Sequence, residues 1–235
     1  MAKDLKKEAK KRIFDAAVSL FARKGYAAVG IREIAKKADV NICMINYYYG
    51  GKVGILREII NECYEKYYRA ITHVDINDIP LEQCVRAIIK NLVAFFRENT
   101  ESALVAFNAL SFDIPEIVDL KTRWTVEYRE KVNKFFSQIG LDTSDATQMN
   151  FVHGLLTTIV ESHFTRRFFY EHIIGTGTLA KSREANVLPE PALDYDDAFY
   201  ENFTEMLTNF YMHGVTGIAT KKHEKMSGEQ VCIEK

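Results

Sequence analysis

The stretch from Gly30 to Lys52 reads GIREIAKKADVNICMINYYYGGK and joins two short helical patterns through a tight turn. The first pattern places apolar residues at the i, i+3, i+4 and i+7 spacing of one helix face, namely Ile31, Ile34, Ala35 and Ala38. Gly30 can cap the start of this helix at little cost. Asp39 then falls where a left-handed backbone is needed, which Asp tolerates better than most residues. The stretch therefore predicts a helix, a turn and a second helix.

The second helix has the features of an element that reads DNA. Asn41 is a good N-cap for a helix from Ile42 to about Tyr48. Ile45 and Tyr49 are four residues apart and can face inward, which leaves polar and aromatic side chains on the outside. A recognition helix in the major groove needs base-edge contacts near its start and phosphate contacts along its flank. We therefore expect this helix to enter the major groove.

A wider segment carries a family resemblance. Residues 12–60, RIFDAAVSLFARKGYAAVGIREIAKKADVNICMINYYYGGKVGILREII, resemble the N-terminal DNA-binding domain of a tetracycline-repressor (TetR) family regulator. The apolar spacing, the Gly-Tyr and Ile-Ala pairs and the aromatic-Gly-Gly-Lys sequence all occur in register. Three positions depart from the family pattern: Gly30 replaces a Ser or Thr cap, Asp39 a turn Gly, and Asn46 a Tyr. The first and third departures affect single phosphate contacts rather than the fold.

The resemblance implies partners and contact positions. It implies a homodimer on double-stranded operator DNA, because one helix–turn–helix reads only a half-site. The candidate DNA contacts, taken from the resemblance and from the outward face of the second helix, are Arg32, Asn41, Ile42, Cys43, Asn46, Tyr47, Tyr48 and Lys52. Apolar side chains near the start of the recognition helix would favour thymine methyl groups, and the Asn and Tyr side chains can donate to phosphates.

Several of these residues have an ordinary structural alternative. Arg32 is either a base or phosphate contact, worth roughly 1–3 kcal/mol of discrimination on guanine, or an exposed charge beside Glu33. Cys43 is either a small residue tolerated at a close approach, a base contact or a redox switch. Lys52 opposes the dipole of the helix it opens, which is easier to accept if its ammonium faces a phosphate. Tyr49 we assign to the core.

The distribution of charge supports a basic head on an acidic body. The net charge is −1, but residues 1–70 hold 15 Lys and Arg against 8 Asp and Glu. The remaining residues are correspondingly acidic, which suits a DNA-binding module joined to a part that does not touch DNA. The alternative is a solvated lysine-rich tail. The basic residues of positions 1–11 are either extra phosphate contacts or a solubilising extension.

Other chemistries find little support. The four cysteines, Cys43, Cys63, Cys84 and Cys232, lack CxxC spacing, so we expect reduced thiols in a cytoplasmic protein and no metal. The sequence shows no P-loop, GxSxG or HExxH motif, and we expect no catalytic residues, no cofactor and no enzyme activity. There is neither a secretory signal nor an apolar run of membrane-spanning length, so we expect no membrane partner.

The whole chain predicts an all-α fold of about nine helices: a three-helix DNA-binding domain and a helical domain for ligand binding and dimerisation. We place the helix–turn–helix domain at 1–52, a connecting helix at 53–72, the effector-binding and dimerisation domain at 73–215 and a disordered tail at 216–235. Residues 73–80 interrupt the helical periodicity with polar turn formers and Pro80. Helices are expected at about 5–24, 81–98, 102–111, 115–139, 145–174 and 195–215.

The C-terminal part predicts an effector site and a dimer face. Apolar, aromatic-lined cavities between helices are the usual small-molecule sites, although aromatics at helical spacing are more often core. Our effector-site candidates are Trp124 and Tyr128, followed by Phe107, Asn108 and His153. The family forms dimers through its last two full helices, and the candidates for that interface are Leu155, Ile159, Phe203, Leu207 and Phe210.

These observations favour a ligand-responsive homodimeric transcription regulator, most simply a repressor released from a near-palindromic operator by a small hydrophobic or aromatic molecule. One alternative is an effector-independent DNA-binding structural or division-linked protein with the same head. A second is an amphipathic helical protein that places its basic N-terminus on anionic membranes. The alanines on the apolar face of the first helix suit packing rather than membrane insertion, which weighs against the second.

Overall fold

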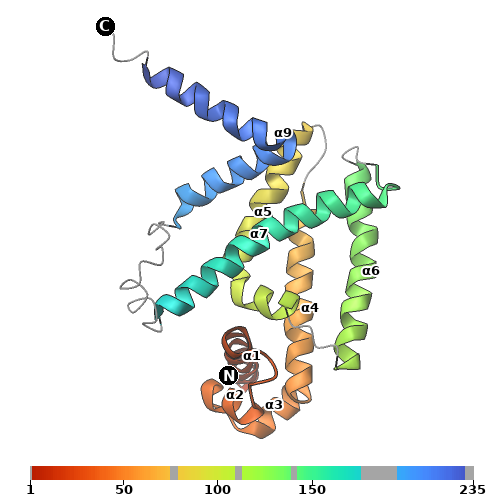
Figure 1. The fold of residues 1–235 in the computed structure, drawn as a ribbon. Coiled ribbons are helices and arrows are strands. Elements are labelled where there is room, and N and C mark those ends of the chain that lie inside the picture. Colours follow the sequence, from red (N-terminus) through yellow and green to blue (C-terminus); the bar gives the residue numbers. More distant parts are fainter. Residues whose placement is uncertain (1, 75–78, 109–112, 139–141, 176–194, 231–235) are drawn as a thin grey trace.

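The computed structural model describes residues 2–74, 79–108, 113–138, 142–175 and 195–230 as an all-α protein (Figure 1). An all-α fold is what the sequence predicts. The helices in these ranges are α1 (Ala2–Lys24), α2 (Ile31–Ala38), α3 (Ile42–Tyr49), α4 (Lys52–Thr72), α5 (Leu81–Asn108), α6 (Pro115–Gln138), α7 (Ala146–Gly175) and α9 (Asp197–Gln230). Residues 176–194 lie outside the described ranges, and so does Cys232.

The turn between α2 and α3 has the local geometry that its sequence predicts. Asp39 adopts the left-handed conformation, with φ 53° and ψ 55°, and it ends α2. Asn41 is the N-cap of α3, where its side-chain oxygen accepts a hydrogen bond of 2.8 Å from the backbone N–H of Cys43. Arg12 of α1 reaches across to this turn and donates through its Nε to the carbonyl of Ala38, at 3.1 Å. The turn is therefore fixed from both sides.

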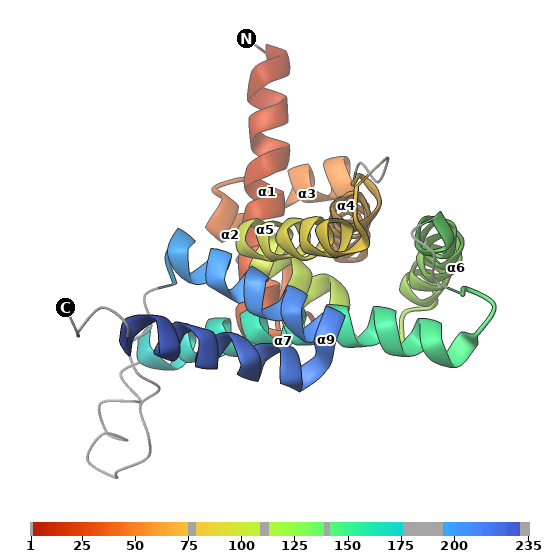
Figure 2. The same ribbon diagram turned by 90° about the horizontal axis from the view of Figure 1, so that it is seen from above.

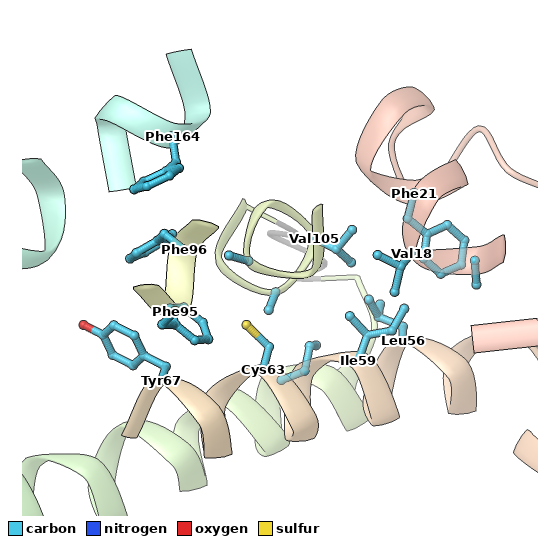
Figure 3. Close-up of a cluster of buried hydrophobic side chains, with 14 of the residues drawn as sticks. Val18, Phe21, Leu56, Ile59, Cys63, Tyr67, Phe95, Phe96, Val105 and Phe164 are labelled. Atoms are coloured by element: carbon cyan, nitrogen blue, oxygen red, sulfur yellow. The ribbon is translucent and has the colours of Figure 1, made fainter. Parts of the chain in front are cut away.

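Helix α4 connects the head to the body. Its first half buries Ile55, Leu56 and Ile59 completely, where it meets α1 and α3. Its second half buries Tyr67 and Ile71, where it packs along α5. Figure 3 shows side chains of α1 at one end of this row and rings of α5 and α7 at the other. Head and body therefore share one continuous hydrophobic core through α4.

The body is arranged around α5. Helices α7 and α9 both pack on α5, while α6 packs against α4 (Figures 1 and 2). Ion pairs join the head to this arrangement: Arg23 of α1 reaches Glu101 of α5 at 3.2 Å, and Arg57 of α4 pairs with Glu116 in the first turn of α6. The first turns of α1 project away from the rest of the molecule (Figure 2).

One helix boundary and one break inside a helix are noteworthy. The segments 81–98 and 102–111 were predicted as two helices, and α5 contains two helical pieces, up to Asn108, on either side of a non-helical residue, Asn99 (φ −126°, ψ 24°). The Asn99 side chain donates to the carbonyl of Phe95, and such a local hydrogen bond competes with the helical ladder. Helix α1 begins at Ala2, which extends the expected helix by about one turn.

The predicted disordered tail is also different in the structure. Helix α9 breaks at Gly214, where φ is 66°, and the backbone is helical again up to Gln230. A left-handed residue ends a helix readily when it is Gly. The residues beyond the break include Ala, Lys, Glu and Met, which are good helix formers.

The contact between α3 and α4 leaves no room for a side chain at Gly54. A Cβ atom at this position would lie 1.6 Å from the carbonyl oxygen of Tyr49, which is backbone and cannot rotate away. We expect Gly54→Ala to destabilise the protein by roughly 2–3 kcal/mol, because α3 and α4 must move apart. Thermal unfolding measured by circular dichroism tests this.

Gly30→Ala is the matched control. A Cβ atom at Gly30 meets nothing within 4 Å, so this variant should lose about 1 kcal/mol or less, through its weaker helix cap alone. Equal melting temperatures for the two variants would show that the close approach at Gly54 does not constrain the fold.

Candidate nucleic-acid interface

Helix α3 packs against the rest of the head through its inner face. Ile45 is fully buried, as predicted, and Tyr49 is 6% exposed. The Tyr49 hydroxyl donates a 2.8 Å hydrogen bond to the carbonyl of Lys10 on α1, and burial raises the pKa of this hydroxyl. These contacts confirm the core role expected for Tyr49 and set the rotation of α3 about its axis.

The opposite face of α3 is open to solvent. Tyr47 is 74% exposed, and its ring meets Tyr48 edge-on with centroids 5.0 Å apart. Asn46 and Cys43 are also exposed, whereas Ile42 and Tyr48 are half-buried. An exposed large aromatic side chain is unusual on a helix that is otherwise well packed. The outer face of α3 thus offers one phenol, one amide and one thiol to a partner.

The side chain of Asn41 has a structural role in addition to its predicted contact with DNA. Its side-chain oxygen already caps α3, while the exposed amide nitrogen keeps its donors. A phosphate near the start of α3 would therefore meet free N–H groups of both side chain and backbone, and helix N-termini favour such anions. The cap and the predicted phosphate contact are compatible because they use different atoms.

Lys52, in the first turn of α4, is held by aromatic rings. Its ammonium lies 4.1 Å from the centroid of the Tyr26 ring and 6.0 Å from that of Phe21. Partial burial lowers the pKa of this ammonium. Tyr26 packs edge-on against Phe21, so the loop after α1 fixes the position of the charge. The sequence did not indicate this contact, because it joins residues 26 positions apart.

Helix α2 presents unpaired positive charge beside α3. Among the described residues, Arg32 and Lys36 are exposed and have no ion-pair partner, whereas Glu33 is engaged by Lys24 at 2.5 Å. The neighbouring carboxylate therefore does not neutralise Arg32. Lys36 was not among the sequence-based candidates, although it lies one turn beyond Arg32 on the same helix.

The candidates for an effector site divide into two groups. Phe107, Trp124 and Tyr128 are half-buried and come together against α4: Phe107 lies 5.2 Å from Tyr67, and Tyr128 lies 5.7 Å from it, centroid to centroid. Asn108 is exposed, so it does not share their surroundings. The side chain of His153 lies outside the described part of the structure.

The candidates for a dimer interface are nearly all at the surface of α7 and α9. Leu155, Ile159, Phe203 and Phe210 are half-buried. Leu207 is 7% exposed and packs inside the protomer, while the adjacent Met206 is 46% exposed. Met206, which the sequence analysis did not name, therefore offers the larger exposed apolar side chain at this point of α9.

Helices α1, α2 and α3, the fixed turn between α2 and α3, and the exposed outer face of α3 define a helix–turn–helix DNA-binding head on a helical body. Comparison with known proteins identifies its family. Residues 13–59 match the model of the bacterial regulatory proteins of the tetR family. The head of this chain therefore matches the TetR family, as the resemblance in the N-terminal segment predicted.

Individual relatives support this assignment through the head. The chain is 42% identical over 67 residues to YttP of Bacillus subtilis, described as a probable HTH-type transcriptional regulator, covering 28% of this chain and 32% of that protein. It is 34% identical over 94 residues to the HTH-type transcriptional regulator BetI of Vibrio campbellii, covering 38% of this chain and 47% of BetI. The chain thus spans a third to a half of these curated relatives.

The similarity of the fold extends further than that of the sequence. The crystal structure of the fatty acid degradation regulator FadR from Bacillus halodurans matches 88% of this chain and 96% of its own, with a TM-score of 0.60 and 17% identity. A TetR-family regulator from Rhodococcus RHA1 matches 85% and 95%, with a TM-score of 0.58 and 22% identity. At these identities the likeness establishes the fold of head and body and leaves their ligands open.

Within the described ranges, no helix has the length and hydropathy needed to cross a membrane. The residues of these ranges also include no cluster of three or more His, Cys, Asp or Glu side chains arranged to hold a metal ion.

The two roles of Asn41 can be separated by substitution. We expect Asn41→Ala to lower the stability of the head by about 1 kcal/mol, because the cap of α3 is lost. Asn41→Asp keeps a capping oxygen and should keep the melting temperature, yet it should weaken DNA binding, since it places a negative charge where a phosphate is expected. Thermal unfolding and a fluorescence anisotropy titration with duplex DNA measure the two effects. If Asn41→Asp bound DNA as well as the unmodified protein, Asn41 would have only its structural role.

Proposed function

We propose that this chain is a homodimeric transcriptional repressor that binds a near-palindromic operator and is released from it by a small-molecule effector. The observation that carries the proposal is the outer face of α3, where Tyr47 stands exposed on a helix fixed by Ile45 and Tyr49. A helix anchored in this way can enter the major groove without reorganising, so little binding free energy is lost to ordering it.

The charges around α3 support DNA as the partner. Arg32 and Lys36 of α2 lie on one flank, and Lys52 at the start of α4 lies on the other. Other lysines of the head have internal partners: Lys10, for example, pairs with Glu58 at 3.0 Å. Cations left without an internal partner are those available to displace counter-ions from phosphates, which supplies much of the affinity for DNA.

Dimerisation through α7 and α9 is supported by their outer faces. Phe151 and Phe169 of α7 are 66% and 58% exposed, and Met206 of α9 is 46% exposed. Large apolar side chains gathered on one surface mark an interaction site, and two copies of one surface form a two-fold interface. A two-fold dimer would place two α3 helices on successive half-sites, about 34 Å apart or a multiple of that distance.

The interior of the body supports an effector rather than a solely structural role. Tyr64 contacts Phe107 and Trp124, and Tyr128 is linked to Phe107 through Tyr67. Tyr64, Phe107, Trp124 and Tyr128 come from three helices, yet each remains half-buried. A filled core would bury such rings completely. An effector that prefers a different spacing of the two heads would shift the population away from the DNA-binding form.

The DNA-binding face can be tested by band shift with a selected operator. We expect Tyr47→Ala to weaken binding about tenfold, through lost contacts with base or backbone, and Lys52→Ala to weaken it and lower the salt slope by about one. Arg123→Ala, an exposed position on α6 in the body, is the control and should bind normally. Operator affinity equal to that of the unmodified protein in both head variants would reject the assigned face.

The dimer face can be tested in solution. We expect Met206→Glu to weaken the dimer at least about 30-fold, because a carboxylate would be buried in an apolar interface. Sedimentation velocity measures the change. Val126→Glu introduces the same charge at a position of α6 that is 57% exposed and away from this face, and it should leave the dimer intact. A dimer unaffected by Met206→Glu would place the interface elsewhere.

A further inference from the structure

A single acidic side chain faces the aromatic cluster of the body from α7. Glu161 lies one helical turn after Thr157, whose hydroxyl is 2.8 Å from the hydroxyl of Tyr67 on α4. It lies one turn before Phe164, which stacks on Phe96 of α5 at 5.7 Å. Because both neighbours point towards α4 and α5, Glu161 points into the same interior rather than to the surface.

The electrostatic influence of Glu161 places its carboxylate near α4. Burial raises the pKa of Tyr64 to about 12, and the charge of Glu161 adds to the increase. The pKa of Tyr67 is likewise raised to about 12 by burial, with a further contribution from Glu161. The thiol of Cys63, the residue before Tyr64 on α4, also has a pKa raised to about 12, chiefly by burial and also by Glu161.

This carboxylate has no partner of opposite charge. Among the described residues, none makes an ion pair or hydrogen bond with Glu161, although other half-buried carboxylates such as Glu101 are paired. Loss of hydration raises the pKa of Glu161 itself. The charge of Lys121 on α6 acts on Cys63 in the opposite direction and lowers the pKa of that thiol, and Lys121 also has an interaction of its own. A half-buried charge without compensation is costly unless a ligand supplies the opposite charge.

The rings beside this carboxylate are arranged in a way that suits a cation. Tyr64 and Trp124 stack with centroids 5.9 Å apart and an interplanar angle of 17°. Phe107 closes on Tyr64 edge-on at 5.3 Å. Electron-rich ring faces attract cations, Trp most strongly, and aromatic cages are the usual means of holding quaternary ammonium groups. The rings also provide apolar area for the body of such a molecule.

We propose that the body binds an organic cation with an apolar tail, held by the carboxylate of Glu161 and by the faces of Tyr64, Tyr67 and Trp124. This proposal deepens the proposed function, on which its regulatory meaning rests, by naming the chemical class of the effector. An anion of the same size is disfavoured, because its charge would face an unneutralised carboxylate in a region of lowered dielectric. The sequence alone suggested only a hydrophobic or aromatic molecule.

The experiment compares two ligands that differ in the sign of their head group. The full-length protein is titrated with decyltrimethylammonium and with decanoate, both below the concentrations at which they form micelles. The only tryptophan of the sequence, Trp124, lies in the proposed site, so its fluorescence reports binding directly. Three proteins are compared: the unmodified chain, Glu161→Gln, and Glu130→Gln, which removes the same charge from an exposed position of α6.

We expect the unmodified protein and Glu130→Gln to bind the cation about tenfold more tightly than decanoate. Glu161→Gln should lose this preference, through weaker binding of the cation and stronger binding of decanoate. Its melting temperature without ligand should be equal or higher, because an ionised group that lost hydration on folding has been removed. Cation binding unaffected by Glu161→Gln, a preference of the unmodified protein for decanoate, or a lower melting temperature of Glu161→Gln would each overturn the proposal.

The same titration in the presence of operator DNA separates this proposal from the function proposed above. Binding of the cation that depends on Glu161 but leaves operator affinity unchanged would confirm the site and contradict its role as an effector site. Operator release by a different ligand, with no dependence on Glu161, would contradict the site and leave the repressor function standing.

Discussion

The packing of α4 is the constraint on which the rest of the structure depends. Ile55, Leu56 and Ile59 bury this helix in the head, and Tyr67 and Ile71 bury it in the body, without an interruption between them. At its start, the close approach of Gly54 to the carbonyl of Tyr49 ties α4 to the DNA-reading helix at backbone distance. Because a close-packed interior has few soft contacts, a displacement of α4 in the body must also displace α3.

Packing joins head and body, whereas the charges differ between two sides of the head. Cations on the side of the head that faces the body are paired internally, as in Arg23 with Glu101 and Arg57 with Glu116. Exposed ion pairs of this kind add little to stability, but they orient one element against another. The cations beside α3 remain without internal partners among the described residues. Although the net charge is −1, the surface around α3 is therefore locally positive, which favours the binding of a polyanion.

Features that depend on neighbouring residues could be predicted from the sequence, whereas contacts between residues far apart in the chain could not. The left-handed Asp39, the cap at Asn41 and the buried face of α3 depend on residues within one or two turns, and all were predicted. The aromatic contact of Lys52 and the interior position of Glu161 depend on which helices meet, and one sequence does not specify that. Helix α7 carries apolar residues around much of its circumference, so its periodicity did not separate inner positions from outer ones.

The aromatic cluster of the body is built partly on α4, the helix that connects the body to the head. Two of its rings, Tyr64 and Tyr67, belong to α4 itself, and the indole N–H of Trp124 donates a 2.8 Å hydrogen bond to the side-chain oxygen of Asn61, also on α4. The hydroxyl of Tyr68, the residue after Tyr67 on α4, donates a 3.0 Å hydrogen bond to the backbone carbonyl of Trp124. A molecule that enters between these rings must therefore change contacts of the helix that holds α3. In the proposed dimer, the binding free energy of such a molecule would be coupled to the spacing of the heads without any additional relay, because the proposed site and the connecting helix share residues.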